Sequence, residues 1–354
     1  MLADLRVRNF RCIESAALDL DASLNVFTGA NGAGKTSFLE SIFFLGRGRS
    51  FRGSDNRILI GRQGTRAEIG GHVIESTGRV YLGVGIAAGG LDIHVAGHAG
   101  CGAADLAARF GIQAIDSEIS DLAEGPPEPR RRLLDWGVFH VEPGYLNAWR
   151  IFRRALAQRN AALREQATDA VLRVWEAELA AAGTVLDDQR RRHAARLASE
   201  FQAVGRRLLD AEVSLAYLSG WNQEHTLGAT LEANRDSDRL AGFTRAGPQR
   251  ADLRCEINAE ATRWRASKGQ QKLLGAALVL AQVGLVAAGE DKRIALIVDE
   301  PAADLDGVRL AAFLAAIASA PAQVFMACIS TAGLPFPDGG KLFHVEHGNA
   351  KALL

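Results

Sequence analysis

The chain has 354 residues, 48% of them hydrophobic, which is enough to bury the core of one large domain or of two ordinary ones. Its formal net charge is zero, so charge alone neither favours nor excludes nucleic acid as a partner. The four cysteines lie far apart with no C-x-x-C pair, which disfavours a zinc ribbon and favours reduced thiols in a cytoplasmic protein. The N-terminus does not have the pattern of a signal peptide. The longest apolar stretch, residues 275–289, is shorter than the ~18 residues of a membrane span and predicts a core helix, so we expect no membrane partner.

The first predicted element is a strand over residues 2–10, with apolar and charged residues alternating along it. Asn9-Phe10-Arg11 ends this strand. Two interpretations of Arg11 remain open: its side chain lies over a bound nucleotide, or it is an ordinary surface arginine.

The strongest motif follows at Gly29-Ala30-Asn31-Gly32-Ala33-Gly34-Lys35-Thr36, which fits G-x-x-x-x-G-K-[ST] at every fixed position. Residues 24–27 before it predict a buried strand, and residues 36–45 after it predict a helix with one apolar face. This context is that of a P-loop, whose backbone N–H groups face phosphate oxygens at a helix N-terminus. We therefore expect residues 29–36 and Ser37 to bind ATP, with Lys35 on the β- and γ-phosphates and the Thr36 hydroxyl on Mg²⁺.

The pattern then becomes β and afterwards helical. Short apolar runs separated by glycine-rich turns over residues 67–95 predict an antiparallel meander. After the breaker at residues 125–129, residues 149–163 and 171–209 predict long helices without a sustained heptad seam, so a very long coiled coil is not expected. Basic clusters at 190–193 and 206–207 are either a solvated helical face or a surface that faces DNA.

The C-terminal part supplies a second half of the nucleotide site. Residues 293–298 predict a buried parallel strand that ends in Asp299-Glu300, the arrangement of a Walker B motif. We expect Asp299 to bind Mg²⁺ through water and Glu300 to activate the attacking water as general base. Because this motif lies far downstream of Lys35, a large insertion must separate the two halves of one site.

Ser267-Lys268-Gly269-Gln270 begins a predicted helix that runs to about residue 288. A helix N-terminus of this kind binds anions, although an ordinary N-capped helix would have the same residues. A second phosphate-binding helix would be redundant within one subunit, but it could bind the γ-phosphate of ATP held by a second copy. The three motifs together predict an α/β fold, an ABC-type P-loop ATPase head with a mixed or parallel sheet, an antiparallel β subdomain and an inserted helical arm, acting as an ATP-dependent homodimer. The expected boundaries are 1–110 for the N-terminal half of the head, 111–210 for the arm and 211–354 for the C-terminal half.

Several blocks in one order resemble the RecF family of bacterial recombination mediators, which is related to SMC-type ATPases. These blocks are residues 9–11, the P-loop, 48–52, 131–143, 156–163, 247–253 and 267–274. The resemblance implies slow ATP hydrolysis as a switch, binding to duplex DNA at single-strand gaps, and cooperation with RecR and RecO in loading RecA, with a link to the SOS response. The chain departs from the family pattern in having Asp299-Glu300 where two aspartates are frequent, Asp304 where Glu is usual, and no glutamine within residues 115–118.

Two other functions are alternatives to a DNA-binding repair ATPase. One is a soluble ABC-type ATPase subunit that drives a transporter or another protein machine. Ser330-Thr331 disfavours the transporter, because transporters carry a γ-phosphate-sensing histidine at this point. The other is a P-loop kinase, which lacks an acceptor lid here and leaves residues 267–270 unexplained.

Overall fold

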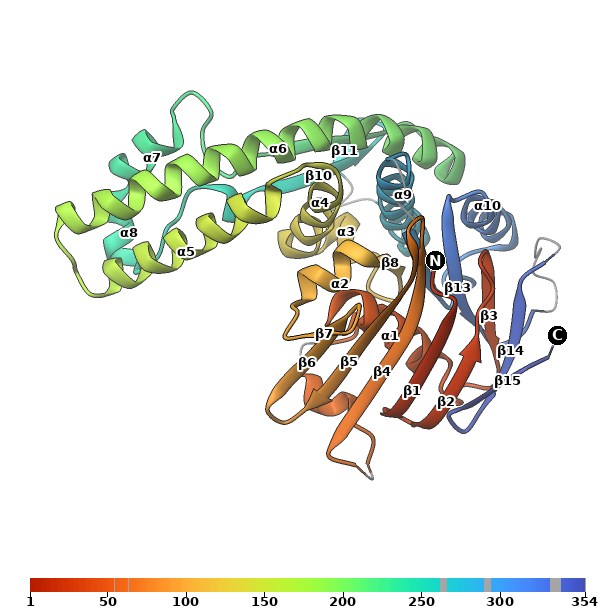
Figure 1. The fold of residues 1–354 in the computed structure, drawn as a ribbon. Helices are drawn as coiled ribbons and strands as arrows, with labels where there is room; N and C mark the ends of the chain where they lie inside the picture. Colours follow the sequence, from red (N-terminus) through yellow and green to blue (C-terminus); the bar gives the residue numbers. More distant parts are fainter. Residues whose placement is uncertain (54, 63, 262–265, 290–293, 332–338, 354) are drawn as a thin grey trace. The chain divides into compact units, whose positions relative to one another are not determined.

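The computed structural model describes residues 1–53, 55–62, 64–261, 266–289, 294–331 and 339–353 (Figure 1). Contacts group the chain into two compact units. The head unit comprises Met1–Ser120, Arg207–Leu209 and Lys268–Leu354, and the inserted unit comprises Asp121–Arg206 and Asp210–Ser267.

This division differs from the expected arm of residues 111–210. Residues 111–120 belong to the head unit because strand β8 (Gly111–Ile115) pairs in parallel with β12 (Ile294–Asp299). Residues 210–267 belong to the inserted unit because strand β9 (Val213–Leu218) pairs with β10 (Asp252–Ile257) there. Local sequence patterns predicted the strands but not their partners, which is why the boundaries were misplaced.

The central sheet of the head unit has the strand order β15-β14-β3-β13-β12-β8. Strands β14, β3, β13, β12 and β8 pair in parallel with their neighbours in this row, and β15 pairs antiparallel with β14. The P-loop strand β3 is buried at every position, as expected for a parallel strand covered on both faces. The predicted residue Arg293 lies outside the described residues, and β12 is described from Ile294. The bounds of the remaining strands are β3 Leu24–Thr28, β13 Ala322–Cys328, β14 Lys341–Glu346 and β15 Asn349–Ala352.

The second sheet of the head unit is antiparallel, with the order β2-β1-β4-β5-β6-β7, and confirms the predicted meander. Leu5, Val7, Leu82 and Val84 are buried on one face, whereas alternate residues lie on the other face. The strands are β1 Asp4–Phe10, β2 Ile13–Asp19, β4 Arg66–Glu75, β5 Gly78–Ala87, β6 Gly90–Val95 and β7 His98–Ala99.

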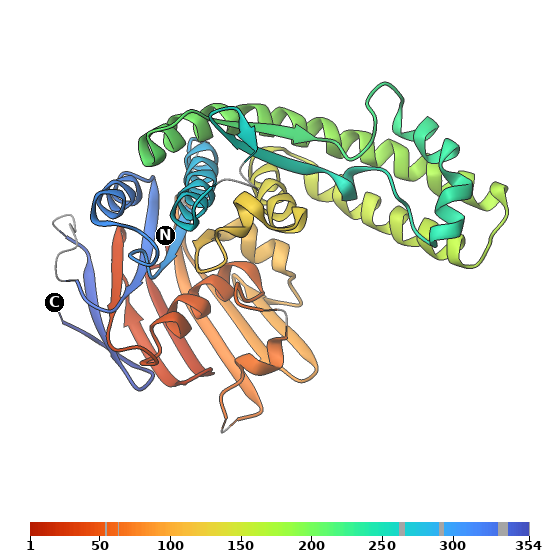
Figure 2. The ribbon, with the colours of Figure 1, turned by 180° about the vertical axis from the view of Figure 1, so that it is seen from behind.

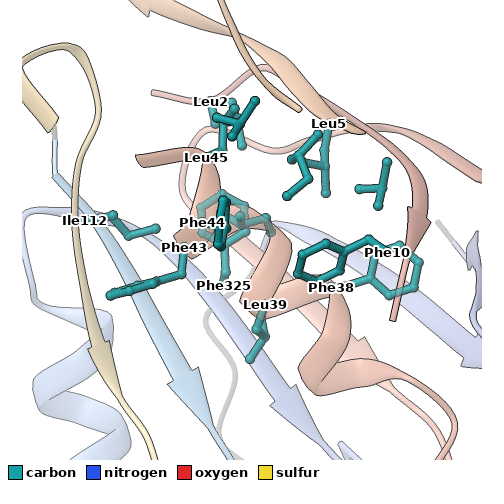
Figure 3. Close-up of a cluster of buried hydrophobic side chains, with 14 of the residues drawn as sticks. Leu2, Leu5, Phe10, Phe38, Leu39, Phe43, Phe44, Leu45, Ile112 and Phe325 are labelled. Carbon is teal, nitrogen blue, oxygen red and sulfur yellow. The ribbon is translucent and has the colours of Figure 1, made fainter. Parts of the chain in front are cut away.

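Helix α1 (Lys35–Arg47) supplies much of the hydrophobic core of the head unit (Figure 3). The ring of Phe27 on β3 stacks on Phe38 of α1 at 5.5 Å and on Phe343 of β14 at 5.0 Å. Gly46 has no side chain because a Cβ there would lie 2.6 Å from the side chain of Ile112. Removing one buried ring costs about 3–5 kcal/mol, so this packing fixes the direction in which α1 leaves the P-loop.

The other helices of the head unit include α9, which begins at the predicted signature. Among the described helices, α9 is the one long and apolar enough to cross a membrane, and 78% of its most apolar window is buried inside the protein, as predicted for a core helix. The bounds are α2 Ala103–Arg109, α9 Lys268–Ala287, α10 Gly307–Ala318 and the 3-10 helix η1 Asn56–Leu59.

The inserted unit is mainly helical, as the sequence predicted, and its strands form the sheet β11-β10-β9. Its longest helix, α6, ends with three residues that are grouped with the head unit. The elements are α3 Asp121–Glu124, α4 Pro127–Val141, α5 Tyr145–Arg164, α6 Asp169–Leu209, α7 Leu227–Ala233, α8 Arg235–Ala241, the 3-10 helix η2 Pro248–Arg250 and the strand β11 Glu260–Ala261.

A buried ionic network joins four segments of the inserted unit. Arg159 on α5 is fully buried, and its guanidinium lies 2.7 Å from Asp238 of α8 and 3.1 Å from Glu176 of α6. Glu176 also accepts a 2.6 Å hydrogen bond from Arg235, and Thr244 accepts one from Arg159 at 2.8 Å. Because each charge has an opposite partner, the network stabilises one arrangement of these segments.

In the first basic cluster on α6, Arg190 belongs neither to a solvated helical face nor to a surface that faces DNA, because its side chain is buried. The Arg190 side chain is only 4% exposed and lies 2.7 Å from the carboxylate of Asp135 on α4. It also donates a 2.7 Å hydrogen bond to the carbonyl oxygen of Pro248. Arg190 therefore links α6 to α4 and to the first residue of η2, and a count of basic residues could not distinguish it from its exposed neighbours.

Candidate nucleotide-binding site

The P-loop connects β3 to α1 in a backbone conformation that requires glycine. Gly29, Gly32 and Gly34 have φ of 150°, 79° and 112°, in the left-handed region that side chains disfavour. A Cβ at Gly29 would lie 2.3 Å from the carbonyl oxygen of Val345. The fixed glycines of the motif therefore follow from backbone geometry and from close packing against β14.

Lys35 begins α1 and is buried. Its ammonium group donates hydrogen bonds to the carbonyl oxygens of Gly29 at 2.9 Å and Ala30 at 3.0 Å. The positive charge is thus held over the loop, next to the N-terminal N–H groups of α1. Both features favour an anion at this position.

The structure brings Thr36 and Asp299 together from distant parts of the sequence. The Thr36 hydroxyl donates a 3.2 Å hydrogen bond to the carboxylate of Asp299, which ends β12. Burial raises the pKa of Asp299, and the charge of Glu300 adds to this, while the hydrogen bond from Thr36 and the charges of Arg52 and Lys35 oppose it. A hydroxyl and a carboxylate side by side fit Mg²⁺, which takes few protein ligands and completes its shell with water and phosphate.

Glu300 follows directly and has an exposed side chain. Its φ of 50° is unusual for a residue other than glycine, and its N–H donates a 3.0 Å hydrogen bond to the carbonyl oxygen of Ala327 on β13. The chain therefore turns sharply after Asp299, so that two consecutive carboxylates occupy different environments.

Asp116 is a carboxylate at this sheet edge that the sequence did not single out. It follows β8, whose Ile115 pairs with Val298 of β12. Burial raises the pKa of Asp116 to about 6, and the charges of Glu118 and Asp299 contribute. The sequence does show a short apolar strand that ends directly before Asp116. Only the pairing of β8 with β12 places Asp116 beside Asp299.

Arg11 has a structural partner and also lines a pocket. Its guanidinium donates two hydrogen bonds of 2.8 Å to the carboxylate of Glu40, which is buried on α1 and also accepts a bond from Ser50. The pocket has a volume of about 540 Å³ and includes Ser37 in its lining. Arg11 is therefore not simply a surface arginine, and the pocket lies beside the first turn of the P-loop helix. Its other lining residues are Asn9, Cys12, Ile13, Glu14, Ile58, Ile60, Gly61 and Arg62.

The signature residues lie at the start of α9. Ser267 immediately precedes the helix, and Gly269 and Gln270 are in its first turn. A Cβ at Gly269 would lie 2.9 Å from the carbonyl oxygen of Asp304, so the first turn packs closely on the loop that follows Glu300. The motif thus needs glycine here for a reason independent of any ligand.

Lys272, one turn further along α9, was not expected to have a role. Its ammonium group donates hydrogen bonds to the carbonyl oxygens of Glu300 and Pro301 at 3.2 Å each and of Ala303 at 2.7 Å. Burial lowers the pKa of Lys272, while the charges of Asp304, Glu300 and Asp299 oppose that shift. The signature helix and the loop after the Walker B strand are therefore joined within the head unit.

Comparisons with known proteins agree on one family. Residues 1–347 match the family described as RecF/RecN/SMC N terminal domain. The chain is 39% identical to the DNA replication and repair protein RecF of Chromohalobacter salexigens, over 94% of this chain and 95% of that protein. It is 33% identical to the protein of the same name from Vibrio cholerae, over 98% of each.

Solved structures show the same fold. A structure described as the recombination mediator protein RecF-ATP in the RecFOR pathway has a TM-score of 0.88 at 23% identity, covering 100% of this chain and 97% of that one. A crystal structure of an Smc head bound to the C-winged helix domain of ScpA has a TM-score of 0.60 at 14% identity, covering 99% of this chain and 96% of that one. These similarities confirm the predicted head fold with its inserted helical segment.

Proposed function

This chain belongs to the RecF family of DNA replication and repair proteins, and from that premise we propose that it is a DNA-binding ATPase of recombinational repair. It binds duplex DNA at single-strand gaps as an ATP-dependent dimer in the cytoplasm. With RecR and RecO it helps to load RecA. Its slow hydrolysis of ATP serves as a switch rather than as a source of continuous work.

The observation that carries the proposal is the hydrogen bond between Thr36 and Asp299 beside the buried Lys35. The P-loop N–H groups and the Lys35 ammonium bind the phosphates of ATP, and the pocket lined by Arg11 and Ser37 is the candidate site for the rest of the nucleotide. Thr36 and Asp299 would hold Mg²⁺, partly through water, and the ion would supply positive charge next to the phosphate oxygens. The exposed Glu300 carboxylate orients the attacking water and accepts its proton.

Dimerisation completes the site in this proposal. Ser267, Gly269 and Gln270 of one copy bind the γ-phosphate held by the other copy, through helix N–H groups and charge-assisted hydrogen bonds. These bonds are lost when the γ-phosphate leaves, so hydrolysis releases the dimer. Within one chain, Lys272 links this helix to the loop that begins at Glu300. The contact between the helix and the partner copy's γ-phosphate is thereby coupled to the position of Glu300.

The test is a titration of a fluorescently labelled gapped duplex, with and without ATP and Mg²⁺, combined with gel filtration. We expect Lys35→Arg to weaken ATP-dependent dimerisation and DNA binding together, by about tenfold or more, because it disturbs a charge-assisted contact. Glu300→Gln should instead trap the ATP-bound dimer on DNA. Lys351→Arg, an equivalent change at an exposed lysine of β15, is the matched control.

A monomer whose DNA affinity is independent of ATP would refute the proposal. Dimerisation with ATP but without salt-sensitive DNA binding would favour an ATPase that drives another protein machine.

A further inference from the structure

The antiparallel sheet of the head unit has a groove on the face opposite to α1. Figure 2 shows α1 in front of this sheet, and Figure 1 shows the opposite face. The groove has a volume of about 650 Å³ and is lined by residues from β1, β2, β4, β5 and β6. It lies apart from the P-loop residues, none of which line it.

Glycines form the floor of this groove. Gly70 of β4 pairs with Gly83 of β5, and Arg6 of β1 and His94 of β6 continue the same row across the sheet. A Cβ at Gly70 would lie 2.3 Å from the hydroxyl oxygen of Tyr81, and one at Gly83 would lie 2.9 Å from its ring. The absence of side chains on these two strands therefore leaves room for the Tyr81 ring to lie along the sheet surface.

Tyr81 remains 41% exposed in this position. One edge contacts His72, whose ring centroid is 5.3 Å away in a T-shaped arrangement. An aromatic ring that lies on a flat floor and is still exposed offers a surface on which an unpaired base can stack. A base inside a duplex is already stacked and paired, and cannot reach the ring.

The charges around the groove favour an anion. Arg6 and Arg8 are exposed on β1, and neither forms an ion pair with any residue that the structure describes. Arg66 lies over Gly85 and pairs with both Glu68 and Asp92, so its single positive charge balances one of these two carboxylates. Arg6, Arg8 and Arg66 thus carry one more charge than Glu68 and Asp92 together, and the two arginines without ion-pair partners lie on the strand next to the glycine floor.

We propose that this groove binds single-stranded nucleic acid, with a base on Tyr81 and backbone phosphates on Arg6 and Arg8. The site is independent of ATP and of the dimer proposed above, because all its residues come from one sheet of one chain. It would hold an unpaired strand through stacking and phosphate contacts without reading its sequence.

The experiment measures the fluorescence anisotropy of an oligothymidylate of about 16 nucleotides, titrated with the full chain without ATP. We expect Arg6→Ala with Arg8→Ala to lower the affinity at least about tenfold and to reduce the slope of log affinity against log salt by about 1.4, since each phosphate contact contributes about 0.7. Tyr81→Leu should lower the affinity about tenfold and leave the salt slope unchanged, and Tyr81→Phe should retain most of the affinity.

The matched control is Arg57→Ala with Arg109→Ala, which removes the same charge from exposed arginines of the head unit outside the groove. Thermal melts establish that each variant is folded. An equal loss in the control, or no loss in either groove variant, would overturn the proposal, as would a polyglutamate peptide binding as tightly as the oligonucleotide. Lys35→Arg should leave this binding intact, so failure here and failure of the ATP-dependent function are distinguishable.

Discussion

The carboxylates at the sheet edge of the head unit and the carboxylate in the buried network of the inserted unit are compensated in opposite ways. In the inserted unit, Glu176 lies between Arg159 and Arg235, with oxygen–nitrogen distances of 3.1 and 2.6 Å. Burial alone would raise the pKa of Glu176, but the hydrogen bonds from these arginines outweigh it and the pKa is lowered. In the head unit, burial raises the pKa of both Asp116 and Asp299.

The difference distinguishes charged residues that stabilise the fold from charged residues that are suited to bind a ligand. A buried carboxylate with arginine partners is neutralised by the protein and stabilises one arrangement. Carboxylates whose pKa is raised by burial and by neighbouring negative charges destabilise the site until a cation binds, and perturbed groups of this kind gather at functional sites. We therefore expect mutations in the inserted unit to alter stability, and mutations at the sheet edge of the head unit to alter ligand and pH responses.

The largest expected effect comes from breaking the paired charges. Arg159→Met should lower the free energy of unfolding by about 3–5 kcal/mol, because it leaves Glu176 and Asp238 buried without this partner. Urea denaturation followed by circular dichroism measures the change. Arg154→Ala is the matched control, since Arg154 lies on the same helix, is 63% exposed and pairs with Glu178.

The control should change the free energy of unfolding by less than about 1 kcal/mol, as exposed pairs do. If both variants lose the same amount, the buried network does not have the role described here, and the contrast between the two units fails.

A smaller effect is expected at the link between the signature helix and the Walker B loop. Lys272→Met should destabilise the protein by about 2 kcal/mol, because carbonyl oxygens of residues 300–303 lose their hydrogen-bond donor. It should also slow ATP turnover by more than Lys268→Met, a change at an exposed lysine one turn earlier on α9. Equal turnover in the two variants would show that the link does not position Glu300.

The sequence was sufficient for those parts of the site that depend on local patterns. The P-loop with its strand and helix, the strand ending in Asp299 and the helix beginning near Ser267 were all predicted. Their proximity followed only from the requirement that the two halves of a P-loop site meet, and the hydrogen bond between Thr36 and Asp299 confirms it. Whether Ser267 reaches a second copy stays a prediction.

Residues whose roles depend on pairing between distant segments could not be predicted. Arg159 appeared only as part of a family block, because nothing in helix periodicity distinguishes a buried arginine from an exposed one. Asp116 needed the alignment of β8 with β12, and Lys272 needed the fold of the loop after Glu300. The same limitation misplaced residues 210–267, whose strand β9 looked like a return to the head but pairs within the inserted unit.

The smallest expected effect is a pH dependence at Asp116. Its pKa is about 6 in the folded protein against an ordinary value of 3.8, so its contribution to stability is full below about pH 3.8 and is lost as the pH rises through about 6. Asp116→Asn removes this loss, and Asp116 is half-buried, so the variant should gain about 1 kcal/mol relative to the parent between about pH 5 and about pH 8. Urea denaturation at the two pH values without nucleotide or Mg²⁺ measures it, with the exposed Glu200→Gln on α6 as control. The pH dependence at Glu176 has the opposite sign. Its pKa in the folded protein is lowered from the ordinary value of 4.5, so its contribution to stability is lost as the pH falls below about 4.5. The difference in free energy of unfolding between Asp116→Asn and the parent protein should therefore grow as the pH rises. If it does not grow, the charge of Asp116 is as well compensated as that of Glu176 in the inserted unit.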